Sequence, residues 1–378
     1  MRFFNTEGPI KQDKHYSLPP LERWDLAQVL TLIDQEKYFL LHAPRQTGKT
    51  TCLLALMEYL NREGRYLALY ANIETAQPAR ENVELAMTGI VQTLANSAHF
   101  WLGDSAPQAL AREVLAEQSA TVALGQFLAR WSAQSPRPTV LLLDEVDALV
   151  GDTLISLLRQ LRAGYSQRPT GFPQTVILCG VRDLRDYRIH SSSEAPITGG
   201  SAFNIKAQSL RLGDFNAAEV RALLQEHTAE TGQTFTEEAM QRVWTLTVGQ
   251  PWLVNALAYE TCFEMRQGRD RSRPITLEMI EQAKENLILR RVTHLDQLAD
   301  KLREPRVRRV IEPMLAGTAL GEVPEDDIQY LIDLGLCRMA PGRGLTIANP
   351  IYREVLPRIL AFTPQASLPQ IAPTWLNP

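Results

Sequence analysis

The residues with the clearest chemical role form the segment Gly48-Lys49-Thr50, which follows an apolar run over 38–41 and a loop of small residues. Apolar residues then recur at helical spacing from Cys52 to Leu60, so the loop lies between a strand and a helix. Backbone N–H groups and a helix N-terminus in this context hold anionic phosphate. The segment predicts a nucleotide-binding loop in which eight successive residues contact the ligand: Pro44, Arg45, Gln46, Thr47, Gly48, Lys49, Thr50 and Thr51.

Two of these side chains have specific roles. Lys49 is expected to contact the β and γ phosphates of a triphosphate as a point charge. The hydroxyl of Thr50 is a hard oxygen ligand of the kind that Mg²⁺ prefers. The loop departs from the GxxxxGK[ST] pattern at its first position, where Ala43 replaces glycine. Because alanine disfavours positive φ, a left-handed backbone at Ala43 would strain the loop.

Two adjacent carboxylates, Asp144 and Glu145, follow the apolar run over 139–143. Ligands bind at the carboxyl ends of strands in parallel α/β sheets, so both acids are expected at the phosphate site. Asp144 is predicted to hold Mg²⁺ through water, and Glu145 to polarise the water that attacks the γ-phosphate. Asp147 is predicted to cap a helix rather than bind metal.

The composition argues against several classes of protein, including those with zinc sites, disulfide frameworks or membrane-spanning helices. The chain has 378 residues, 45% of them hydrophobic, and a net charge of −4, so it has no global attraction for nucleic acid or anionic membrane. The four cysteines form no CxxC pair, which argues against a zinc site or a disulfide framework and fits a reducing compartment. No apolar run approaches membrane-spanning length, so the expected location is the cytoplasm, without membrane contact.

The order of the elements predicts an α/β fold. Apolar or alternating runs at 38–41, 65–73, 139–144, 174–180 and 204–212 are expected to be strands of a parallel P-loop NTPase sheet flanked by helices. Helices are expected over 21–35, 52–60, 83–98, 107–132 and 154–161. Residues 191–201 are small and polar and are expected to form a loop.

The pattern changes after Asp214. Four helical segments at 217–230, 237–247, 252–266 and 276–292 predict an all-helical lid. Helices near 296–303, 306–316 and 325–334, short strands around 341–344 and a last helix at 352–360 predict a winged-helix domain. We therefore expect an N-terminal arm (1–20), an ATPase core (21–213), a helical lid (214–292), a winged helix (293–362) and a tail (363–378).

Several segments together resemble the AAA+/STAND division of P-loop ATPases, in particular the bacterial and archaeal AAA-like ATPases with a C-terminal winged helix. The matching segments are APRQTGKTT (43–51), LLLDEVDAL (141–149), CGVRD (179–183), GQPWLVNALA (249–258) and NPIYREVLPR (349–358). The resemblance covers roughly residues 1–362 and implies ATP and Mg²⁺ as ligands. It also implies ATPase activity with low intrinsic turnover.

The resemblance implies further site residues. Arg182 occupies the position of a residue that senses the γ-phosphate, although a surface arginine in a charged turn fits the sequence equally well. Pro251, in a Gly-Gln-Pro motif, would lie near the adenine, with Tyr16 of the N-terminal arm opposite; Pro251 also suits the first turn of a helix. An arginine finger is expected from a neighbouring subunit or domain, and three candidates remain open: Arg159, Arg162 and Arg168.

The resemblance also implies partners. One hypothesis is a homo-oligomeric switch, assembled on ATP binding, that controls an effector protein or a fused nuclease-like domain. A second is an ATP-dependent DNA-binding protein of the initiator or transposition-helper kind, and a third is a nucleotide-stabilised scaffold with little turnover. A basic cluster over 290–309 favours DNA contact. However, interleaved acids and the acidic start of the helix at 325–334 favour ion pairs on a solvated helix face.

Overall fold

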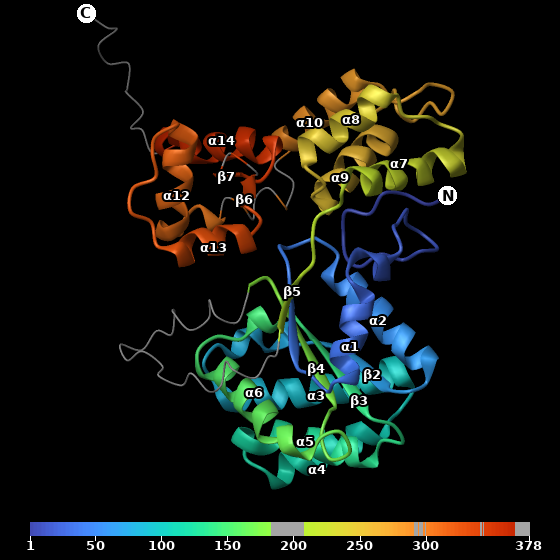
Figure 1. Ribbon diagram of the computed structural model, residues 1–378, viewed down its shortest axis with the longest axis vertical. Helices are drawn as coiled ribbons and strands as arrows, with labels where there is room; N and C mark the ends of the chain where they lie inside the picture. The colour runs from blue at the N-terminus through green and yellow to red at the C-terminus, as the bar shows by residue number, and fades with distance from the viewer. Residues whose placement is uncertain are drawn as a thin grey trace, which may run out of the picture. The chain divides into compact units, whose positions relative to one another are not determined.

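The computed structural model describes residues 1–182, 208–290, 294, 298, 300–340, 342 and 344–366. The chain divides into two compact units (Figure 1). The sheet unit comprises Glu7–Gln12 and Ser17–Gly213, and the helical unit comprises Met1–Thr6, Asp13–Tyr16 and the chain from Asp214 onward. The loop predicted at 191–201 lies outside the described residues, as does the tail from 367 onward.

The sheet unit contains a five-stranded parallel sheet, as predicted. Its strands are β1 (Phe39–His42), β2 (Leu67–Asn72), β3 (Thr139–Asp144), β4 (Thr175–Gly180) and β5 (Gln208–Arg211), in the order β2-β3-β4-β1-β5. Every residue of β1, β3 and β4 is buried, which explains why these strands are continuous apolar runs in the sequence. The carboxyl ends of β3, β4 and β1 consequently lie next to one another along one edge.

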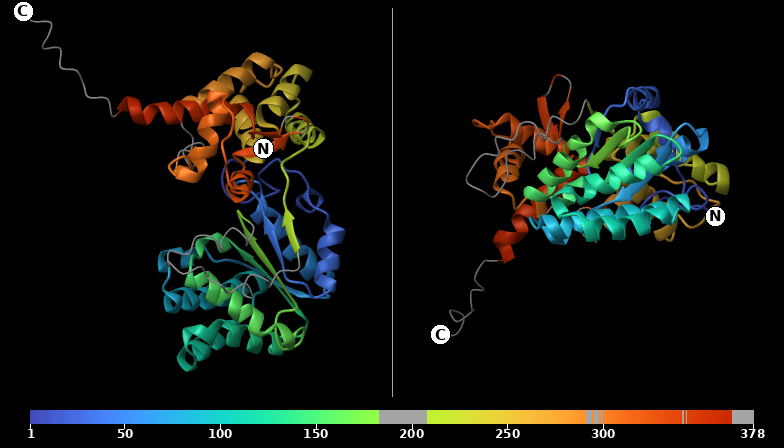
Figure 2. Two further views of the ribbon diagram at one scale, coloured as in Figure 1. Left: turned by 60° about the vertical axis from the view of Figure 1, so that its left-hand side comes forward. Right: turned by 90° about the horizontal axis from the view of Figure 1, so that it is seen from below.

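Helices cover both faces of this sheet (Figure 2). Helices α1 (Leu26–Asp34) and α2 (Lys49–Glu63) pack on one face. Helices α3 (Val83–Leu102), α4 (Ala106–Glu117), α5 (Ala120–Gln134) and α6 (Asp152–Ala163) pack on the other. Each layer buries its own cluster of hydrophobic side chains against the strands.

Two helix predictions in this unit are wrong in detail. The helix expected over 107–132 is two helices, because Gln118 and Ser119 adopt extended backbone between α4 and α5, and the Ser119 carbonyl accepts the first N–H bonds of α5. The helix expected over 21–35 begins as a separate 3₁₀ turn, η1 (Pro20–Arg23). α1 starts only after Asp25, whose side chain accepts a bond from the Gln28 N–H.

The helical unit contains α7 (Ala217–Thr231), α8 (Glu237–Thr247), α9 (Pro251–Tyr259) and α10 (Leu277–Leu289), and α9 continues into a π-helical turn, η7 (Glu260–Glu264). Asn216 and Glu219 form a capping box at the start of α7, and Gly232, with φ +77°, ends it. These local signals explain why the sequence located the helices closely.

The remaining chain of the helical unit consists of α12 (Pro305–Ala316), α13 (Glu325–Asp333), the antiparallel strands β6 (Cys337–Ala340) and β7 (Gly344–Ile347), and α14 (Pro350–Ala366). This arrangement fits a winged helix. The Asn349 side chain accepts from the Tyr352 N–H at the start of α14. Residues 363–366, expected in the tail, belong to this helix. In the described part of the chain, no helix combines the length and apolarity needed to cross a membrane.

Candidate nucleotide-binding site

The phosphate loop connects β1 to α2. Gly48 is the N-cap of α2 and adopts φ +92°, a conformation that glycine tolerates best. Gln46 also has positive φ, +59°, whereas Ala43 is not among the described residues with a left-handed backbone. The strain considered for Ala43 therefore does not arise, because the loop makes its left-handed turns at Gln46 and Gly48. The first turn of α2 directs its N–H groups and the positive end of the helix dipole at this loop.

The side chain of Lys49 lies inside the phosphate loop and bonds its backbone. Its side chain is buried, and Nζ donates to the carbonyls of Ala43 and Pro44, each at 3.0 Å. The hydroxyl of Thr47 donates to the same Pro44 carbonyl at 2.8 Å. These bonds hold the loop closed around the ammonium group. A lysine has three N–H donors, so one donor remains for an anionic ligand.

Thr50 and Asp144 meet although they are distant in the sequence. The Thr50 hydroxyl donates to Oδ2 of Asp144 at 2.7 Å, and the Tyr70 hydroxyl donates to the same oxygen at 3.0 Å. Asp144 is fully buried, and its Oδ1 accepts from the Glu145 N–H at 2.9 Å. A hydroxyl and a carboxylate held this close form a hard-oxygen donor set, which fits Mg²⁺. The two predicted metal ligands are thus brought together.

Glu145 follows the buried end of β3 with φ +58°. A left-handed backbone is uncommon for a residue with a Cβ and is often found at functional sites. Burial raises the pKa of the Glu145 carboxyl, and the neighbouring charge of Asp144 raises it further, while Lys49 and Arg45 act in the opposite direction. A carboxylate with a raised pKa accepts a proton more readily, which is the property required of a general base.

Asp147 does not act as the predicted helix cap. Its carboxylate instead accepts from the backbone N–H of Val181 at the end of β4, and Oδ1 lies 4.0 Å from Nε of Arg182. Gly180 leaves room for this contact, since a Cβ there would lie 2.8 Å from Oδ2 of Asp147. The prediction failed because the partner of Asp147 comes from another strand and not from the next turn of its own chain.

Arg182 therefore lies at the edge of the sheet where the phosphate loop and the acids lie. β4 runs between β1 and β3, and Arg182 follows its carboxyl end. Its side chain is 21% exposed and close to Asp147. This position is compatible with sensing phosphate, and the role itself stays a prediction. Of the loop residues, Arg45 is exposed, whereas the Thr51 hydroxyl accepts from the Ile10 N–H at 3.1 Å.

Two residues that support this site from outside were missed by sequence reasoning. Tyr70 lies on β2, where it reads as an ordinary strand aromatic, and only the pairing of β2 with β3 brings its hydroxyl to Asp144. Arg23, in η1, donates to the Thr47 carbonyl at 3.0 Å. Neither residue belongs to a motif, so no local signal in the sequence could have identified them.

Two predicted adenine contacts belong to the helical unit. Tyr16 is fully buried there, and its hydroxyl lies 3.2 Å from Nδ1 of His227. An adenine contact by Tyr16 stays a prediction. Pro251 is buried at the first position of α9, behind the N-cap Gln250. An adenine contact by Pro251 stays a prediction.

The three candidate arginine fingers differ in their surroundings. Arg168 contacts its own unit: Nε donates to the Tyr165 carbonyl at 2.8 Å, and the guanidinium lies 3.4 Å from the centre of the Tyr165 ring. Arg162 also interacts within the described structure. Arg159 is exposed on α6, and no ion pair or hydrogen bond of its side chain occurs among the described residues. Arg159 is therefore the candidate best able to reach a neighbouring molecule.

The basic cluster is paired with acids wherever the structure describes it. Three of its arginines are bound as follows: Arg290 to Glu260 at 2.7 Å, Arg308 to Glu312 at 2.6 Å, and Arg309 to Asp327 at 3.7 Å. Arg306 lies 3.2 Å from the centre of the Tyr330 ring and pairs with Glu304. These pairs support the interpretation of the cluster as ion-paired helix faces, because each arginine already has an acidic partner.

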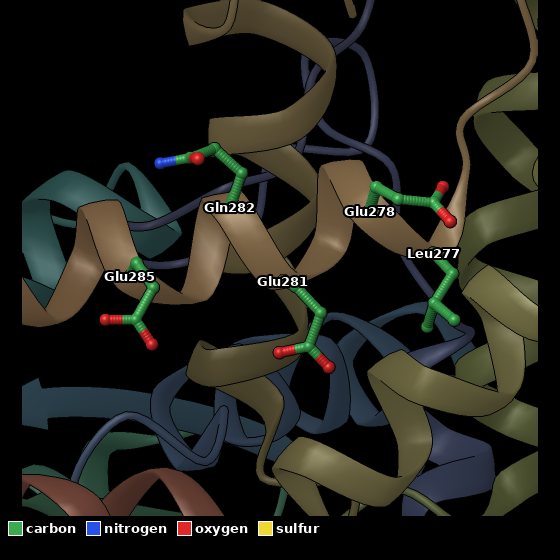
Figure 3. Close-up of a pocket in the computed structure, with 5 residues that line it drawn as sticks. All are labelled: Leu277, Glu278, Glu281, Gln282 and Glu285. Atoms are coloured by element: carbon green, nitrogen blue, oxygen red, sulfur yellow. The ribbon is translucent and has the colours of Figure 1, made fainter.

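A surface hollow of about 410 Å³ lies along α10 (Figure 3). Its lining includes Glu281 and Glu285, whose side chains project from the same side of α10. Glu281 pairs with Arg242, and Lys284 lies 3.2 Å from Glu285 and 3.0 Å from Glu354. Since these carboxylates already have cationic partners, we assign no ligand to this hollow.

Comparison with known proteins agrees with this geometry. Residues 23–178 match the family model of the AAA ATPase domain. The chain is similar in structure to a Walker-type ATPase of Pyrococcus abyssi, at 15% identity with a TM-score of 0.61, over 94% of this chain and 99% of that one. It is also similar to Cdc6p of Pyrobaculum aerophilum, at 17% identity with a TM-score of 0.50, over 93% and 96% of the two chains. No curated protein matches the sequence.

At these identities the structural likeness supports the fold alone, and the family match supports the chemistry of the segment that it covers. That segment contains the loop with Lys49 and Thr50 together with Asp144 and Glu145. The strand order, the closed loop and the paired acids are the features expected of a site for a nucleoside triphosphate. The sheet unit therefore has a P-loop NTPase fold, and residues 23–178 of it resemble the AAA ATPase domain in sequence.

Proposed function

We propose that this protein binds ATP with Mg²⁺, hydrolyses it slowly, and uses its nucleotide state to change conformation or assembly and so control a partner protein. The observation that carries the proposal is the 2.7 Å bond between the Thr50 hydroxyl and Asp144 beside the buried Lys49. It brings the predicted metal ligands and the phosphate-binding lysine to one place. The AAA ATPase match over residues 23–178 supports nucleotide binding and hydrolysis.

The residues of the site divide the chemistry among them. Lys49 and the N–H groups at the start of α2 bind the β and γ phosphates, and Mg²⁺ held by Thr50 and Asp144 would neutralise phosphate charge. Glu145 orients the attacking water and accepts its proton, a task that its raised pKa favours. Arg182, at the end of β4, is proposed to contact the γ-phosphate. The work obtained from hydrolysis is then conformational, as in a STAND-type switch with a lid and a winged helix.

The test combines phosphate release with particle mass. We expect slow, Mg²⁺-dependent release of phosphate from ATP and a larger particle with a non-hydrolysable ATP analogue than without nucleotide. Binding without phosphate release under any condition would replace the switch by a nucleotide-stabilised scaffold. A particle that stays monomeric while it turns over ATP would contradict an arginine finger supplied by a second subunit.

The described structure gives no specific support to direct DNA binding. The arginines of the basic cluster are paired with acids, and α13 begins with Glu325, Asp326 and Asp327, which repel phosphate. A gel-shift series at increasing ionic strength checks this conclusion. Tight binding that resists salt would show that the winged-helix region has another role.

A further inference from the structure

Arg23 joins two parts of the sheet unit that are far apart in the sequence. One is the phosphate loop, and the other is Gly213, the last residue of the sheet unit before the chain enters the helical unit. We infer that Arg23 is a positioning residue that couples the state of the phosphate loop to this exit of the chain. The inference deepens the proposed function and rests on it, because it takes the loop to be the ATP site.

The guanidinium group makes both contacts at once. Nη1 donates to the carbonyl of Thr47 at 3.0 Å, and Nη2 donates to the carbonyl of Gly213 at 2.7 Å. Nη1 also lies 3.2 Å from the point where a Cβ of Gly48 would stand, so the group packs against the turn that begins α2. Arginine is suited to this bridge because its planar fork presents several donors in fixed directions, whereas lysine has a single ammonium group.

A second bond ties the same exit segment to the other end of the loop. The N–H of Leu212 donates to the carbonyl of His42 at 3.0 Å, and His42 is the last residue of β1 before the loop begins. The loop is therefore attached to residues 212–213 at both ends: at its entry through His42, and near its exit through Thr47 and Arg23. A shift of the loop has to shift or break one of these bonds.

Arg23 itself is held in a fixed frame. It belongs to η1, which starts at Pro20, and the Pro20 carbonyl accepts from the Cys52 thiol of α2 at 3.3 Å. Asp25, two residues further on, caps α1. The residues on both sides of Arg23 are thus attached to α1 and α2, which pack on the same face of the sheet. This attachment limits the movement of the Arg23 backbone, so its guanidinium can connect the phosphate loop to residues 212–213.

A bound nucleotide would restrict the loop, since phosphate oxygens bond its N–H groups. Through Arg23 this restriction is passed to the segment 212–213. The amide of Leu212 is a convenient reporter, because it exchanges with solvent only when its bond to His42 opens. Nucleotide should therefore slow its hydrogen exchange, and most of the slowing should require the Arg23 bridge, because the bond to His42 holds only the entry of the loop.

The experiment measures hydrogen exchange at Leu212 with and without ATP and Mg²⁺ in the full chain and in Arg23→Lys and Arg23→Ala. In the parent, nucleotide is expected to slow exchange by about tenfold, the effect of one charge-assisted hydrogen bond on an opening equilibrium. Arg23→Lys keeps the positive charge and should bind a fluorescent ATP analogue, yet lose most of the slowing. Arg65→Ala, which removes an exposed arginine paired with Asp34 and Glu63, is the control and should behave as the parent.

The outcomes separate this inference from the proposed function. A parent that binds no nucleotide would overturn both. A parent that binds ATP without slowing at Leu212 would overturn the coupling alone, and so would an Arg23→Lys or Arg23→Ala variant that keeps the full nucleotide-dependent slowing. Loss of the slowing in both variants, with nucleotide still bound by Arg23→Lys, would establish Arg23 as the link.

Discussion

The hydroxyl of Thr50 donates to Oδ2 of Asp144 at 2.7 Å, across a separation of 94 residues in the chain. The first residue follows the lysine of the phosphate loop, and the second ends β3. They meet because β3 and β1 lie on either side of β4 in a parallel sheet, so Asp144 and the loop that leads into α2 both follow strand ends at the same edge. This bond joins the phosphate loop to the acids that we propose bind Mg²⁺ and orient water.

Lys49→Ala should abolish tight nucleotide binding. The substitution removes the cation expected at the β and γ phosphates and two bonds that close the loop. A charge-assisted bond is worth about 1.5–3 kcal/mol, so affinity should fall at least tenfold. Titration with a fluorescent ATP analogue measures this change. The control is Lys14→Ala, an exposed lysine outside the site, and equal affinity of the two variants would refute the loop assignment.

Glu145→Gln should separate binding from hydrolysis. The amide keeps the size of the side chain but cannot accept a proton, so turnover should fall by roughly 10²–10⁴, the usual contribution of a general base. ATP should bind as in the parent, because Asp144 and Lys49 remain. Phosphate release and a melting curve in ATP and Mg²⁺ test both statements, and the trapped complex should melt at the higher temperature.

The rate of the parent should also depend on pH through this group. The pKa of Glu145 is raised above its ordinary value, so the proton-accepting form is lost on acidification at a higher pH than for an exposed glutamate. The acid limb of the pH–rate profile should accordingly lie above pH 4.5. An acid limb below that value, or a parental rate in Glu145→Gln, would show that another group is the base.

Tyr70→Phe should weaken the metal site without emptying it. The change removes one of the two hydroxyls bonded to Oδ2 of Asp144 and leaves a buried carboxylate with a missing donor. A cost of about 1–3 kcal/mol in stability is expected, with a higher Mg²⁺ concentration needed for half-maximal turnover. Tyr59→Phe is a matched control, since its hydroxyl bonds the exposed Glu63 on α2. Identical Mg²⁺ dependence of the two variants would argue against a role for Tyr70.

Arg159→Ala should lower turnover, and Arg168→Ala should lower stability instead. Arg159 is exposed, whereas Arg168 contacts Tyr165 and the ring of Tyr38 in its own unit. An arginine finger supplied by a second subunit is worth about 10³ or more in rate, and its loss leaves binding intact. Phosphate release at several protein concentrations, compared with thermal melting, distinguishes the two. A parental rate in Arg159→Ala at every concentration would exclude it as the finger.

Stability should fall on acidification through two buried histidines. Burial lowers the pKa of His227, and burial lowers the pKa of His294 from 6.5 to about 4. The unfolded chain then binds protons that the folded chain does not, so the folded chain loses stability as the pH falls below 6.5. For His294 this loss continues until the pH is about 4. Each histidine changes the free energy of unfolding by at most about 1.4 kcal/mol per pH unit.

Urea unfolding between pH 7.5 and 4.5 measures this slope. His294→Gln should flatten it, because the variant has no group to protonate at that position. The control is His99→Gln. His99 is an exposed residue near the end of α3 in the sheet unit, and its ring lies beside the Ser105 hydroxyl. If His294→Gln leaves the pH dependence of the free energy of unfolding unchanged, His294 does not cause the loss of stability on acidification.

The sequence by itself determined the features that depend on residues close together in the chain, namely the motifs and the order of strands and helices. Gly48-Lys49-Thr50 between a strand and a helix, and two acids at the end of a buried strand, identify the site because their meaning lies in local order and spacing. The alternation of apolar runs with helical periods determined the parallel sheet in the same way, since burial on both faces requires continuous apolar strands. Helical periodicity after Asp214 located the helices of the helical unit, and the structure shows Asn216 and Gly232 at the two ends of α7.

Only the tertiary structure decided which distant groups meet. Asp147 bonds the end of β4, Tyr70 reaches Asp144, Arg23 bridges Thr47 and Gly213, and Tyr16 is buried beside His227. Each of these contacts depends on the strand order β2-β3-β4-β1-β5 or on packing between segments far apart in the chain. A single sequence contains no local signal for such pairings, because the same residue types stand equally well on a solvated surface. Packing of the whole chain selects the partner, and with it the role of the residue.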